Sequence, residues 1–492
     1  MDIEIVHTAL EYAGLRLVVL TGPRRDRIIL RNLASEFVIA YRISVTQSAN
    51  WTSFKVTLAI VRTITMAVED AKFIRQKVMD HNKWFEESIP MIASENLMSP
   101  LAKEMLISDF ADRYAEGLPG KRYYQGNIYV DQVELKTIEL AKKVFDADFA
   151  DVRPISGTVA NMAVLFAFAQ PGDTITTCAL AQGAHISTCE FGAFGQRAVK
   201  SVNYPFNEHD MNLDVDGTIK LLKEVKPKIA QFGLSVFLFP PPLKELEDTF
   251  NEIGCLVWED CAHVLGLVAG KQFHDPLREG VNIVSSSTHK TFPGPNHGML
   301  LGANMTEEQE KKLQKAVFPG VTSSHHLHAM AALGITLAEM EVFAKDYAAQ
   351  ACKNSRALGQ ALYERGIPVL CPDLGFTRSH AIAVDVSQFG GGRDCAKLLE
   401  DANIICNKNM LPRDTSSVNP SGLRLGSQEM TRLGMKESEM DEVADFIARV
   451  IVKKEDTSKV KEDVKEFKKQ FATIQYCFNA GEPAYAYHKL VE

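Results

Sequence analysis

The sequence has no Cys-x-x-Cys pair, although it contains nine cysteines. Disulfide frameworks and zinc sites bring cysteines together at short, regular spacings. Here the cysteines are scattered between positions 178 and 477, and several lie inside apolar runs. This distribution favours reduced thiols, and therefore a cytoplasmic protein without a structural zinc site.

The chain also lacks a block of basic residues. Lys and Arg number 54 against 62 Asp and Glu, which gives a formal net charge of −8. Binding to nucleic acid or to an anionic membrane usually requires positive charge concentrated on one segment or face. No secretory signal is visible, and the apolar run at 15–20 is too short to span a bilayer. We therefore expect neither nucleic acid nor a membrane as a partner.

Length and hydrophobic content allow a large core. The chain has 492 residues, of which 46% are hydrophobic, enough for two or more structural units. The first 65 residues carry only short apolar runs, and a charged segment of helical character opens at Met66. We predict the following regions: an N-terminal appendage (1–65), an N-terminal helical arm (66–100), a large domain (101–340), a small C-terminal domain (341–450) and a C-terminal extension (451–492).

Strand-like and helix-like segments alternate in the middle of the chain. Short apolar runs of strand character are found at 228–232, 255–258 and 281–284. A helix-like segment, 243–253, separates the first two. This alternation is typical of an α/β fold whose mainly parallel sheet is covered by helices on both faces. Ligands bind beyond the carboxyl ends of such strands, so we expect Asp260, His263 and Lys290 to share one crevice.

Lys290 lies in the stretch SSSTHKTFPGP, at 285–295. The segment Phe292–Pro295 cannot easily continue a strand or a helix, so the lysine comes where the chain leaves the sheet. A solvated loop lysine is the commoner case and needs no such setting. A lysine at the end of a buried strand can instead point its amine into a pocket.

A second feature is the turn Ser156-Gly157-Thr158, which precedes an apolar helical stretch at 159–169. Small hydroxyl residues and glycine at a helix N-terminus can hold a phosphate, because free N–H groups and the helix dipole point at it. An ordinary N-cap is the commoner use of such residues. Both interpretations remain open at this point.

A strand-end lysine, an aspartate before it and a phosphate-type helix start have one chemistry in common. In enzymes that use pyridoxal 5′-phosphate (PLP), a lysine holds the cofactor as a Schiff base. An aspartate keeps the pyridine nitrogen protonated, which makes the ring an electron sink. The combination of Lys290, Asp260 and the turn at 156–158 therefore predicts PLP as the cofactor.

Longer stretches resemble the serine hydroxymethyltransferase family, from about residue 67 to the C-terminus. The matching segments are IASENLMSP (92–100), YAEGLPGKRYYQGN (114–127), EDCAHVLGLVAG (259–270), STHKT (287–291), FPGV (318–321), NKN (407–409) and SGLRLG (421–426). Further segments look like the archaeal branch: GKQFHDPLREG (270–280), SSHHLH (323–328) and the C-terminal TIQYCF. The resemblance implies the PLP-dependent aminotransferase-like fold (fold type I), with a smaller C-terminal α/β domain and a homodimer as the minimal unit.

The same resemblance implies roles for individual residues. Lys290 would carry PLP, Asp260 would pair with the pyridine nitrogen, and His263 would lie near the ring hydroxyl. His185 would stack on the ring face. The implied phosphate contacts are Ser156, Gly157, Thr158, Tyr114, Ser323 and Ser324, and Ser235 and His289 would lie close by as further cofactor contacts. The implied contacts of the amino-acid substrate are Ser94, Tyr124 and Arg424, and those of a reduced pterin are Glu116, Tyr123 and Asn409.

Arg424 and Glu116 carry specific expectations within this set. Arg424 would grip the substrate carboxylate, because a guanidinium fork can donate two parallel hydrogen bonds. Glu116 would handle a proton at the serine hydroxyl or at the pterin. Several of the implied site residues come from the neighbouring subunit in this family.

The sequence departs from the family pattern at three places. The family commonly has GPRGG after the lysine segment, where this chain has GPNHG at 294–298. A glycine pair after FPG is replaced by Ser323-Ser324, and DMAH is replaced by EDCAH. Backbone N–H donors survive the first two changes, so we expect phosphate binding with an altered geometry.

The predicted reaction is the reversible transfer of a hydroxymethyl group from L-serine to tetrahydrofolate or tetrahydromethanopterin, which gives glycine. One alternative is a PLP aldolase or transaldolase that acts on 3-hydroxy amino acids without a pterin. Another is a catalytically idle scaffold protein, which would bind no cofactor.

Several residues also have a purely structural interpretation. Asp260 and His263 can form a structural pair, Arg424 a surface ion pair, and Glu116 a solvated loop acid. The histidines at 325, 326 and 328 invite a metal site, but their spacing is not that of two ligands on one helix face. We therefore expect no metal site.

Overall fold

The computed structural model describes residues 15–20, 27–32, 38–41 and 51–491, with side chains from Met66 onward. The chain divides into two compact units, one of residues 1–83 with 486–492 and one of residues 84–485. The expected appendage, 1–65, lies partly outside the described residues.

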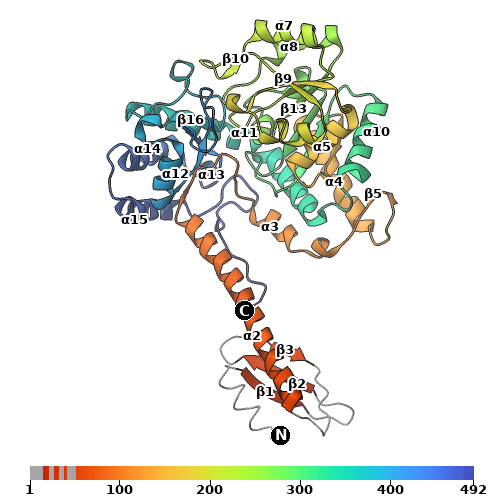
Figure 1. Ribbon diagram of the computed structural model, residues 1–492, viewed down its shortest axis with the longest axis vertical. Helices are drawn as coiled ribbons and strands as arrows, with labels where there is room; N and C mark the ends of the chain where they lie inside the picture. The colour runs from red at the N-terminus through yellow and green to blue at the C-terminus, as the bar shows by residue number, and fades with distance from the viewer. Residues whose placement is uncertain (1–14, 21–26, 33–37, 42–50, 492) are drawn as a thin grey trace. The chain divides into compact units, whose positions relative to one another are not determined.

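The first unit contains an antiparallel sheet and most of a long helix. The strands β1 (Leu15–Leu20), β2 (Arg27–Asn32) and β3 (Val38–Tyr41) pair in that order (Figure 1). Helix α2 (Trp51–Glu86) follows and begins before Met66, where the sequence predicted a helical segment to open. Arg75 donates a hydrogen bond to the carbonyl of Val491, 2.7 Å away, so the end of the chain belongs to this unit.

A seven-stranded sheet organises the second unit. Its order is β7-β15-β14-β13-β12-β8-β9, and β15 alone runs antiparallel to its neighbours. The strands are β7 (Phe149–Asp151), β15 (Gly298–Gly302), β14 (Ile283–Ser287), β13 (Leu256–Asp260), β12 (Ile229–Phe232), β8 (Thr174–Thr177) and β9 (Lys200–Asn203). The predicted α/β class with a mainly parallel sheet is therefore confirmed.

Helices cover both faces of this sheet because alternate residues of each strand point to opposite sides. Trp258 and Ile283 pack toward one face, and their neighbours Val257 and Val284 pack toward the other. The first face is covered by α5 (Gly157–Phe168), α6 (Ala193–Gln196) and α10 (Glu307–Lys315). The second is covered by α4 (Ile128–Phe145), α7 (Val215–Val225), α8 (Leu243–Ile253), α9 (Leu265–Ala269) and α11 (Leu327–Glu364).

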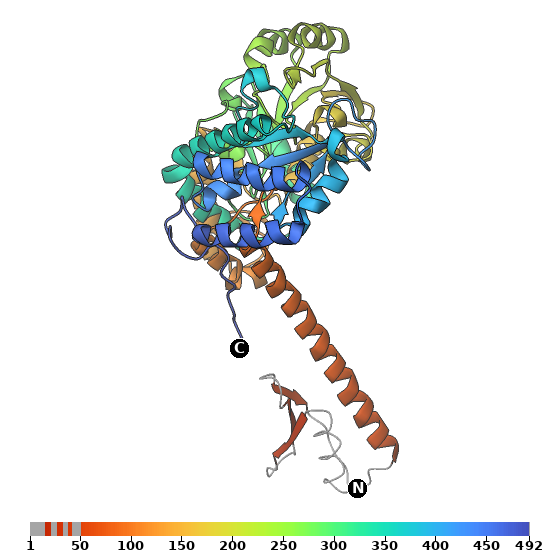
Figure 2. The ribbon, with the colours of Figure 1, turned by 90° about the vertical axis from the view of Figure 1, so that its left-hand side faces the viewer.

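A smaller sheet, in the order β16-β19-β18, has its own hydrophobic core. Its strands are β16 (Ala381–Asp385), β19 (Gly422–Gly426) and β18 (Asn407–Asn409), and the short β4 (Ile89–Pro90) and β17 (Ile404–Ile405) pair beside it. The helices here are α12 (Gly392–Asp401), α13 (Gln428–Arg432), α14 (Glu437–Ile451) and α15 (Thr457–Lys468), with α14 and α15 side by side in blue in Figure 2. Further elements of this unit are α3 (Pro100–Leu106) and two short hairpins, β5 (Gly117–Leu118) with β6 (Lys121–Arg122) and β10 (Phe206–Asn207) with β11 (Asn212–Leu213).

Helix α11 contributes to two hydrophobic cores of the second unit. Its first half packs in the core of the large sheet, and Leu358 and Leu362 pack in the core of the small one. Within the described residues it is the one helix long and apolar enough to cross a membrane, but 61% of its apolar window is buried inside the protein. Such burial is that of a core helix. The predicted boundary at residue 340 falls inside α11, and the boundaries of the predicted regions remain predictions.

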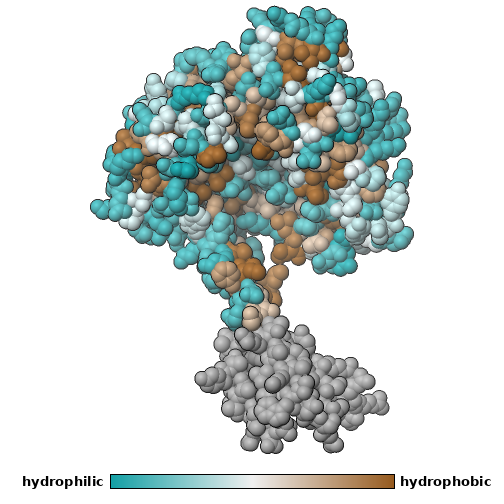
Figure 3. Space-filling view, in the orientation of Figure 1, coloured by the Kyte–Doolittle hydropathy of each residue, from teal (hydrophilic) through white to brown (hydrophobic). Residues whose placement is uncertain are grey.

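One predicted segment differs from the structure in an informative way. The apolar run 281–284 predicted a strand, but β14 continues through the buried serines to Ser287. The charged helix α15 lies in the predicted C-terminal extension and buries one of its lysines, Lys468. On the face shown in Figure 3, hydrophilic side chains are interspersed with hydrophobic patches.

The C-terminal segment of the second unit closes over a buried ionisable cluster. The Tyr485 hydroxyl donates to Glu429 Oε1 at 2.7 Å, and the Lys468 ammonium lies 4.6 Å from the centre of the Tyr485 ring. Lys468 also donates to the carbonyl of Glu86 at 3.2 Å, and Lys103 donates to the carbonyl of Ala484 at 3.1 Å. Burial raises the pKa of Glu429 to about 7 and lowers the pKa of Lys468 to about 8.

This cluster predicts a pH-dependent stability. The pKa of Glu429 is raised in the folded state, so folding favours the protonated carboxyl. The contribution of Glu429 to the free energy of unfolding is fully present below about pH 4.5 and is lost as the pH rises through about 7. Glu429→Gln keeps an acceptor for Tyr485 without the charge. We expect the variant to gain up to about 3 kcal/mol over the wild type between pH 5 and pH 8, measured by denaturant unfolding. A stability difference that stays constant over this pH range would contradict the assignment.

Candidate active site

A cavity of about 520 Å³ lies at the carboxyl ends of β13 and β14. The start of α5 and the strand β19 of the small sheet also reach it. The predicted site residues that line it are Ser94, Ser156, Gly157, Thr158, His185, Ser235, Asp260, His263, His289, Lys290 and Arg424. The structure therefore brings together residues that lie up to several hundred positions apart in the sequence.

Lys290 follows the end of β14 and points into this cavity. It is 9% exposed, and within residues 66–491 its ammonium has no hydrogen-bond or ion-pair partner. The side chain of Asn96 donates to the Lys290 carbonyl at 2.6 Å and so fixes the backbone. Burial lowers the pKa of Lys290 to about 8, against the opposing effect of Asp260. A buried amine with this pKa is readily neutral and therefore nucleophilic. The interpretation of Lys290 as a solvated loop lysine is therefore excluded.

Asp260 ends β13 and is held by donors on both carboxylate oxygens. The backbone N–H of Ala262 donates to Oδ1 at 3.0 Å, and the side-chain amide of Asn161 donates to Oδ2 at 2.8 Å. Among the described residues no hydrogen bond joins Asp260 to His263. The structural pair that the sequence allowed is therefore absent there, and each side chain faces the cavity separately.

His263 is a neutral imidazole whose ring N–H has no hydrogen-bond acceptor among residues 66–491. Its Nε2 lies 3.4 Å from Arg424 Nη1, which can only donate, so the ring proton is on Nδ1. This Nδ1 is buried and has no hydrogen-bond partner among residues 66–491. Burial, and then the positive charges of Lys290 and Arg424, lower the pKa of His263 well below its usual value. The ring also stacks on buried His380, with the ring centres 5.8 Å apart.

Arg424 is a buried cation without a carboxylate partner among the described residues. It is 8% exposed and donates to the Ser235 carbonyl at 2.8 Å and to Asn407 Oδ1 at 3.3 Å. Burial lowers its pKa to about 10. The interpretation of Arg424 as part of a surface ion pair is therefore wrong. A buried guanidinium of this kind favours an anionic ligand in the cavity.

The start of α5 combines an N-cap with a close approach to β14. Ser156 Oγ accepts from the N–H of Val159 at 3.2 Å, so the N-cap interpretation holds. A Cβ on Gly157 would lie 3.0 Å from both Cβ and N of Ser287, which brings Ser287 against the helix start. Ser287 Oγ and His289 Nδ1 are buried and lack partners among residues 66–491. Burial, and then Lys290, lower the pKa of His289 to about 4.

These unpartnered atoms fit PLP. His263 Nδ1, Ser287 Oγ and His289 Nδ1 all belong to side chains that line the cavity. Buried polar atoms are normally hydrogen-bonded, and PLP offers a ring oxygen and phosphate oxygens as acceptors. The residues present therefore suit the cofactor that the sequence predicted.

The other predicted site residues form a second cluster and do not line the cavity. They are Tyr114, Glu116, Tyr123, Tyr124, Ser323 and Ser324. The Tyr114 hydroxyl donates to Glu116 Oε1 at 3.0 Å, and the Tyr114 and Tyr124 rings lie 4.8 Å apart. The Ala115 N–H donates to Ser324 Oγ at 3.2 Å. Glu116 is therefore half-buried and hydrogen-bonded rather than fully solvated. Asn409, in β18, also lies outside the cavity lining.

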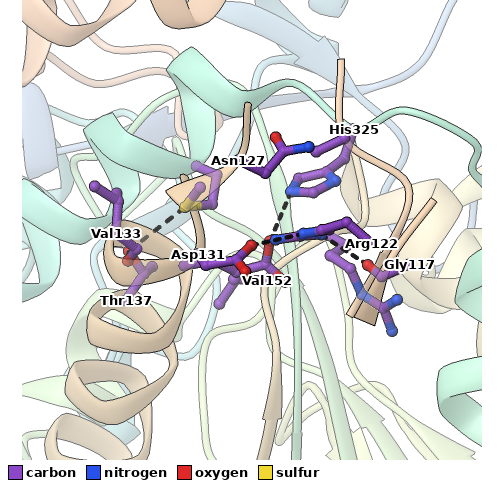
Figure 4. Close-up of polar contacts among 12 residues, drawn as sticks. Gly117, Arg122, Asn127, Asp131, Val133, Thr137, Val152 and His325 are labelled. Atoms are coloured by element: carbon purple, nitrogen blue, oxygen red, sulfur yellow. Dashed lines mark hydrogen bonds and ion pairs between the residues drawn. The ribbon is translucent and has the colours of Figure 1, made fainter. Parts of the chain in front are cut away.

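A buried ionic network supports this tyrosine cluster. Arg122 donates to the Gly117 carbonyl at 2.7 Å and to Asp131 Oδ1 at 2.8 Å (Figure 4). It also donates to Glu134 Oε2, which lies 3.2 Å from His325 Nε2. The network ties the hairpin β5–β6 and the segment at 323–325 to helix α4. No group of three potential metal ligands occurs among the described residues.

Sequence reasoning missed Asn96, Asn161, Ser287 and His380, which hold or flank the predicted residues. Asn161 left one signal, because a polar asparagine is unfavourable inside an otherwise apolar helix. The others left none, because their roles depend on contacts between distant segments.

Comparison with known proteins agrees with this geometry. Residues 67–447 match the family model of serine hydroxymethyltransferase. A curated serine hydroxymethyltransferase from Thermoplasma volcanium is 54% identical over 87% of this chain and 100% of its own. Those from Picrophilus torridus and Methanocaldococcus jannaschii are 53% and 50% identical, over 86% and 84% of this chain and 98% and 96% of theirs. The resemblance to the archaeal branch is confirmed.

A solved structure has the same fold. It is the crystal structure of L-threonine transaldolase from Pseudomonas fluorescens in the internal aldimine state. It matches with a TM-score of 0.78 and 26% identity, over 85% of this chain and 96% of that one. The predicted fold type I is therefore confirmed. Together with the family match, these findings show that the chain belongs to the serine hydroxymethyltransferase family of PLP-dependent transferases.

Proposed function

We propose that this enzyme transfers the hydroxymethyl group of L-serine reversibly to a reduced pterin and so forms glycine. The observation that carries the proposal is the pair Lys290 and Arg424. Both are buried, both line one cavity, and among the described residues neither has a carboxylate partner within ion-pair distance. A nucleophilic amine and a carboxylate-binding cation in one cavity are what a PLP enzyme acting on an amino acid needs.

Each residue around the cavity would hold a different part of the cofactor. Lys290 would hold the cofactor covalently, Asp260 its pyridine nitrogen, and His263 Nδ1 its ring oxygen. Ser287, His289 and the N–H groups at the start of α5 would hold its phosphate. PLP, when bound, supplies an electron sink for the electron pair of the bond that breaks at the substrate Cα.

Arg424 selects which bond breaks. By holding the serine carboxylate, it fixes the rotation about the bond from Cα to the amino nitrogen. That rotation would decide which bond at Cα the bound cofactor weakens, and here it would be the bond to the hydroxymethyl carbon. Orientation therefore favours one-carbon transfer over other reactions of the same amino acid.

We assign the tyrosine cluster to the cavity of a second copy of the chain, in a homodimer. Its support is that Tyr114, Glu116 and Tyr124 contact one another and yet do not line the cavity of their own chain. In the partner's cavity, Glu116 would move a proton at the serine hydroxyl or at the pterin. Tyr123 and Asn409 would lie along the pterin. We place the homodimer in the cytoplasm.

The proposal is tested by glycine formation from L-serine with tetrahydrofolate, with tetrahydromethanopterin and with no pterin. We expect turnover with at least one pterin, and a rate without pterin lower by about a hundredfold or more. L-Threonine is the matched control substrate, because a pterin-independent transaldolase acts on it. Rapid turnover of threonine together with serine turnover unaffected by either pterin would contradict the proposal.

A further inference from the structure

A chain of buried hydrogen bonds runs behind Asp260. Trp258 Nε1 donates to Ser285 Oγ at 2.8 Å, and Ser285 Oγ donates to Asn161 Oδ1 at 2.6 Å. Asn161 Nδ2 then donates to Asp260 Oδ2 at 2.8 Å. Trp258 and Ser285 are fully buried, and neither lines the cavity.

Strand register explains how these side chains meet. Trp258 and Asp260 lie two residues apart on β13, so they point to the same face of the sheet. Ser285 on β14 is the register partner of Asp260. Helix α5 packs over this face and brings Asn161 onto both strands.

The two ends of the chain fix the direction of its bonds. An indole N–H can only donate, so Ser285 Oγ accepts from Trp258. The Asn161 NH₂ group donates to Asp260, so the Asn161 carbonyl faces Ser285 and accepts a hydrogen bond from its hydroxyl. A flipped amide would present its oxygen to Asp260 and would require a protonated carboxyl.

The same amide reaches a second cavity residue. Asn161 Nδ2 lies 3.4 Å from Ser187 Oγ, which lies 2.7 Å from His185 Nδ1. The Ser187 backbone N–H also donates to His185 Nδ1 at 3.2 Å. His185 Nδ1 is therefore an acceptor, and the imidazole proton is on Nε2.

We infer that Trp258, Ser285 and Asn161 are positioning residues that hold Asp260 as an ionised acceptor facing the cofactor ring. The inference rests on the proposed function, because it concerns the pyridine nitrogen of PLP. Donation by Asn161 stabilises the carboxylate, and the carboxylate in turn stabilises the protonated pyridine nitrogen. We call the three residues the tryptophan relay. Loss of any member weakens PLP binding without removing a cavity charge.

The test measures the PLP dissociation constant by equilibrium dialysis for Asn161→Leu, Ser285→Ala and Trp258→Phe. A hydrogen bond to a charged group predicts about ten- to hundredfold weaker binding for Asn161→Leu. Ser285→Ala and Trp258→Phe each remove a hydrogen bond between neutral groups, so we expect about three- to tenfold weaker PLP binding. Ser286→Ala is the matched control, because Ser286 is the adjacent buried serine of β14 and, within residues 66–491, its hydroxyl bonds only the Ser287 carbonyl. It should bind PLP like the wild type.

Two further variants separate an effect on the position of Asp260 from an effect on packing alone. In Asp260→Asn the carboxylate is absent, so the relay variants should have no further effect on the PLP dissociation constant. Phe194→Leu loosens the contact with the Trp258 ring, 6.0 Å away, but leaves the indole N–H in place. It should lower the unfolding temperature while PLP binding stays unchanged.

The outcomes are distinguishable. Equal PLP affinity in the wild type, Ser285→Ala and Asn161→Leu would overturn the relay while leaving the proposed function intact. An equal loss in the Asp260→Asn background would also overturn it, because the loss would then come from packing. A wild-type protein that binds no PLP would instead refute the proposed function. Where Trp258→Phe fails to fold, Ser285→Ala decides the question alone.

Discussion

Lys290→Ala is expected to abolish serine turnover, by on the order of a thousandfold or more, and to remove the visible absorption of the bound cofactor. The lysine is the buried amine of the cavity, and its lowered pKa of about 8 makes it readily available in the neutral form. Alanine leaves no nucleophile at this position. The rate is measured as glycine formation, and the cofactor is measured from the absorption spectrum of the purified protein.

Lys468→Met is the matched control for this result. Burial also lowers the pKa of Lys468 to about 8, but its ammonium contacts the Glu86 carbonyl and the Tyr485 ring and does not line the cavity. We expect this variant to keep the visible absorption. A folded Lys290→Ala protein with wild-type absorption and turnover would contradict the assignment of Lys290.

Arg424→Ala is expected to raise the KM for serine by about ten- to hundredfold, the loss expected for charge-assisted hydrogen bonds to a carboxylate. Arg424→Lys should restore only part of this loss, because an ammonium cannot reproduce the two parallel bonds of a guanidinium fork. The measurement is steady-state kinetics with serine as the varied substrate.

The absorption spectrum provides the control for Arg424. Because the expected loss concerns the substrate, the Ala variant should still show the visible absorption of bound PLP. An unchanged KM would exclude Arg424 from the substrate site. A variant that loses the cofactor as well would show that Arg424 acts chiefly through its contacts with Ser235 and His263.

The fold was predictable where local pattern determines it. Helix α8 has the predicted bounds, 243–253, because its apolar face and its ends are both readable in the sequence. The end of β14 was not predictable, because its serines look like loop residues, and the hydrogen-bond partners of Ser285, which are Trp258 and Asn161, come from distant segments. The burial of Lys468 was not predictable for the same reason, since its partners come from residues 86 and 485.

The residues of the candidate site were predictable where a sequence motif contains them, but their spatial arrangement was not. Motifs identified Lys290, Asp260 and Arg424, and the fold brings them to one cavity. The motifs could not tell that Tyr114 and Glu116 lie outside that cavity, because the place of this loop depends on contacts between segments that are distant in the sequence. Nor could they reveal the tryptophan relay, which depends on the register of β13 against β14.

The most direct test of the account is to reduce the PLP-loaded protein with borohydride and map the modified lysine by peptide mass spectrometry. Reduction turns the link between cofactor and lysine into a stable secondary amine. The account predicts one modified site, Lys290, in the peptide that contains STHKT. Modification of another lysine, above all of the buried Lys468, with Lys290 left free would contradict it.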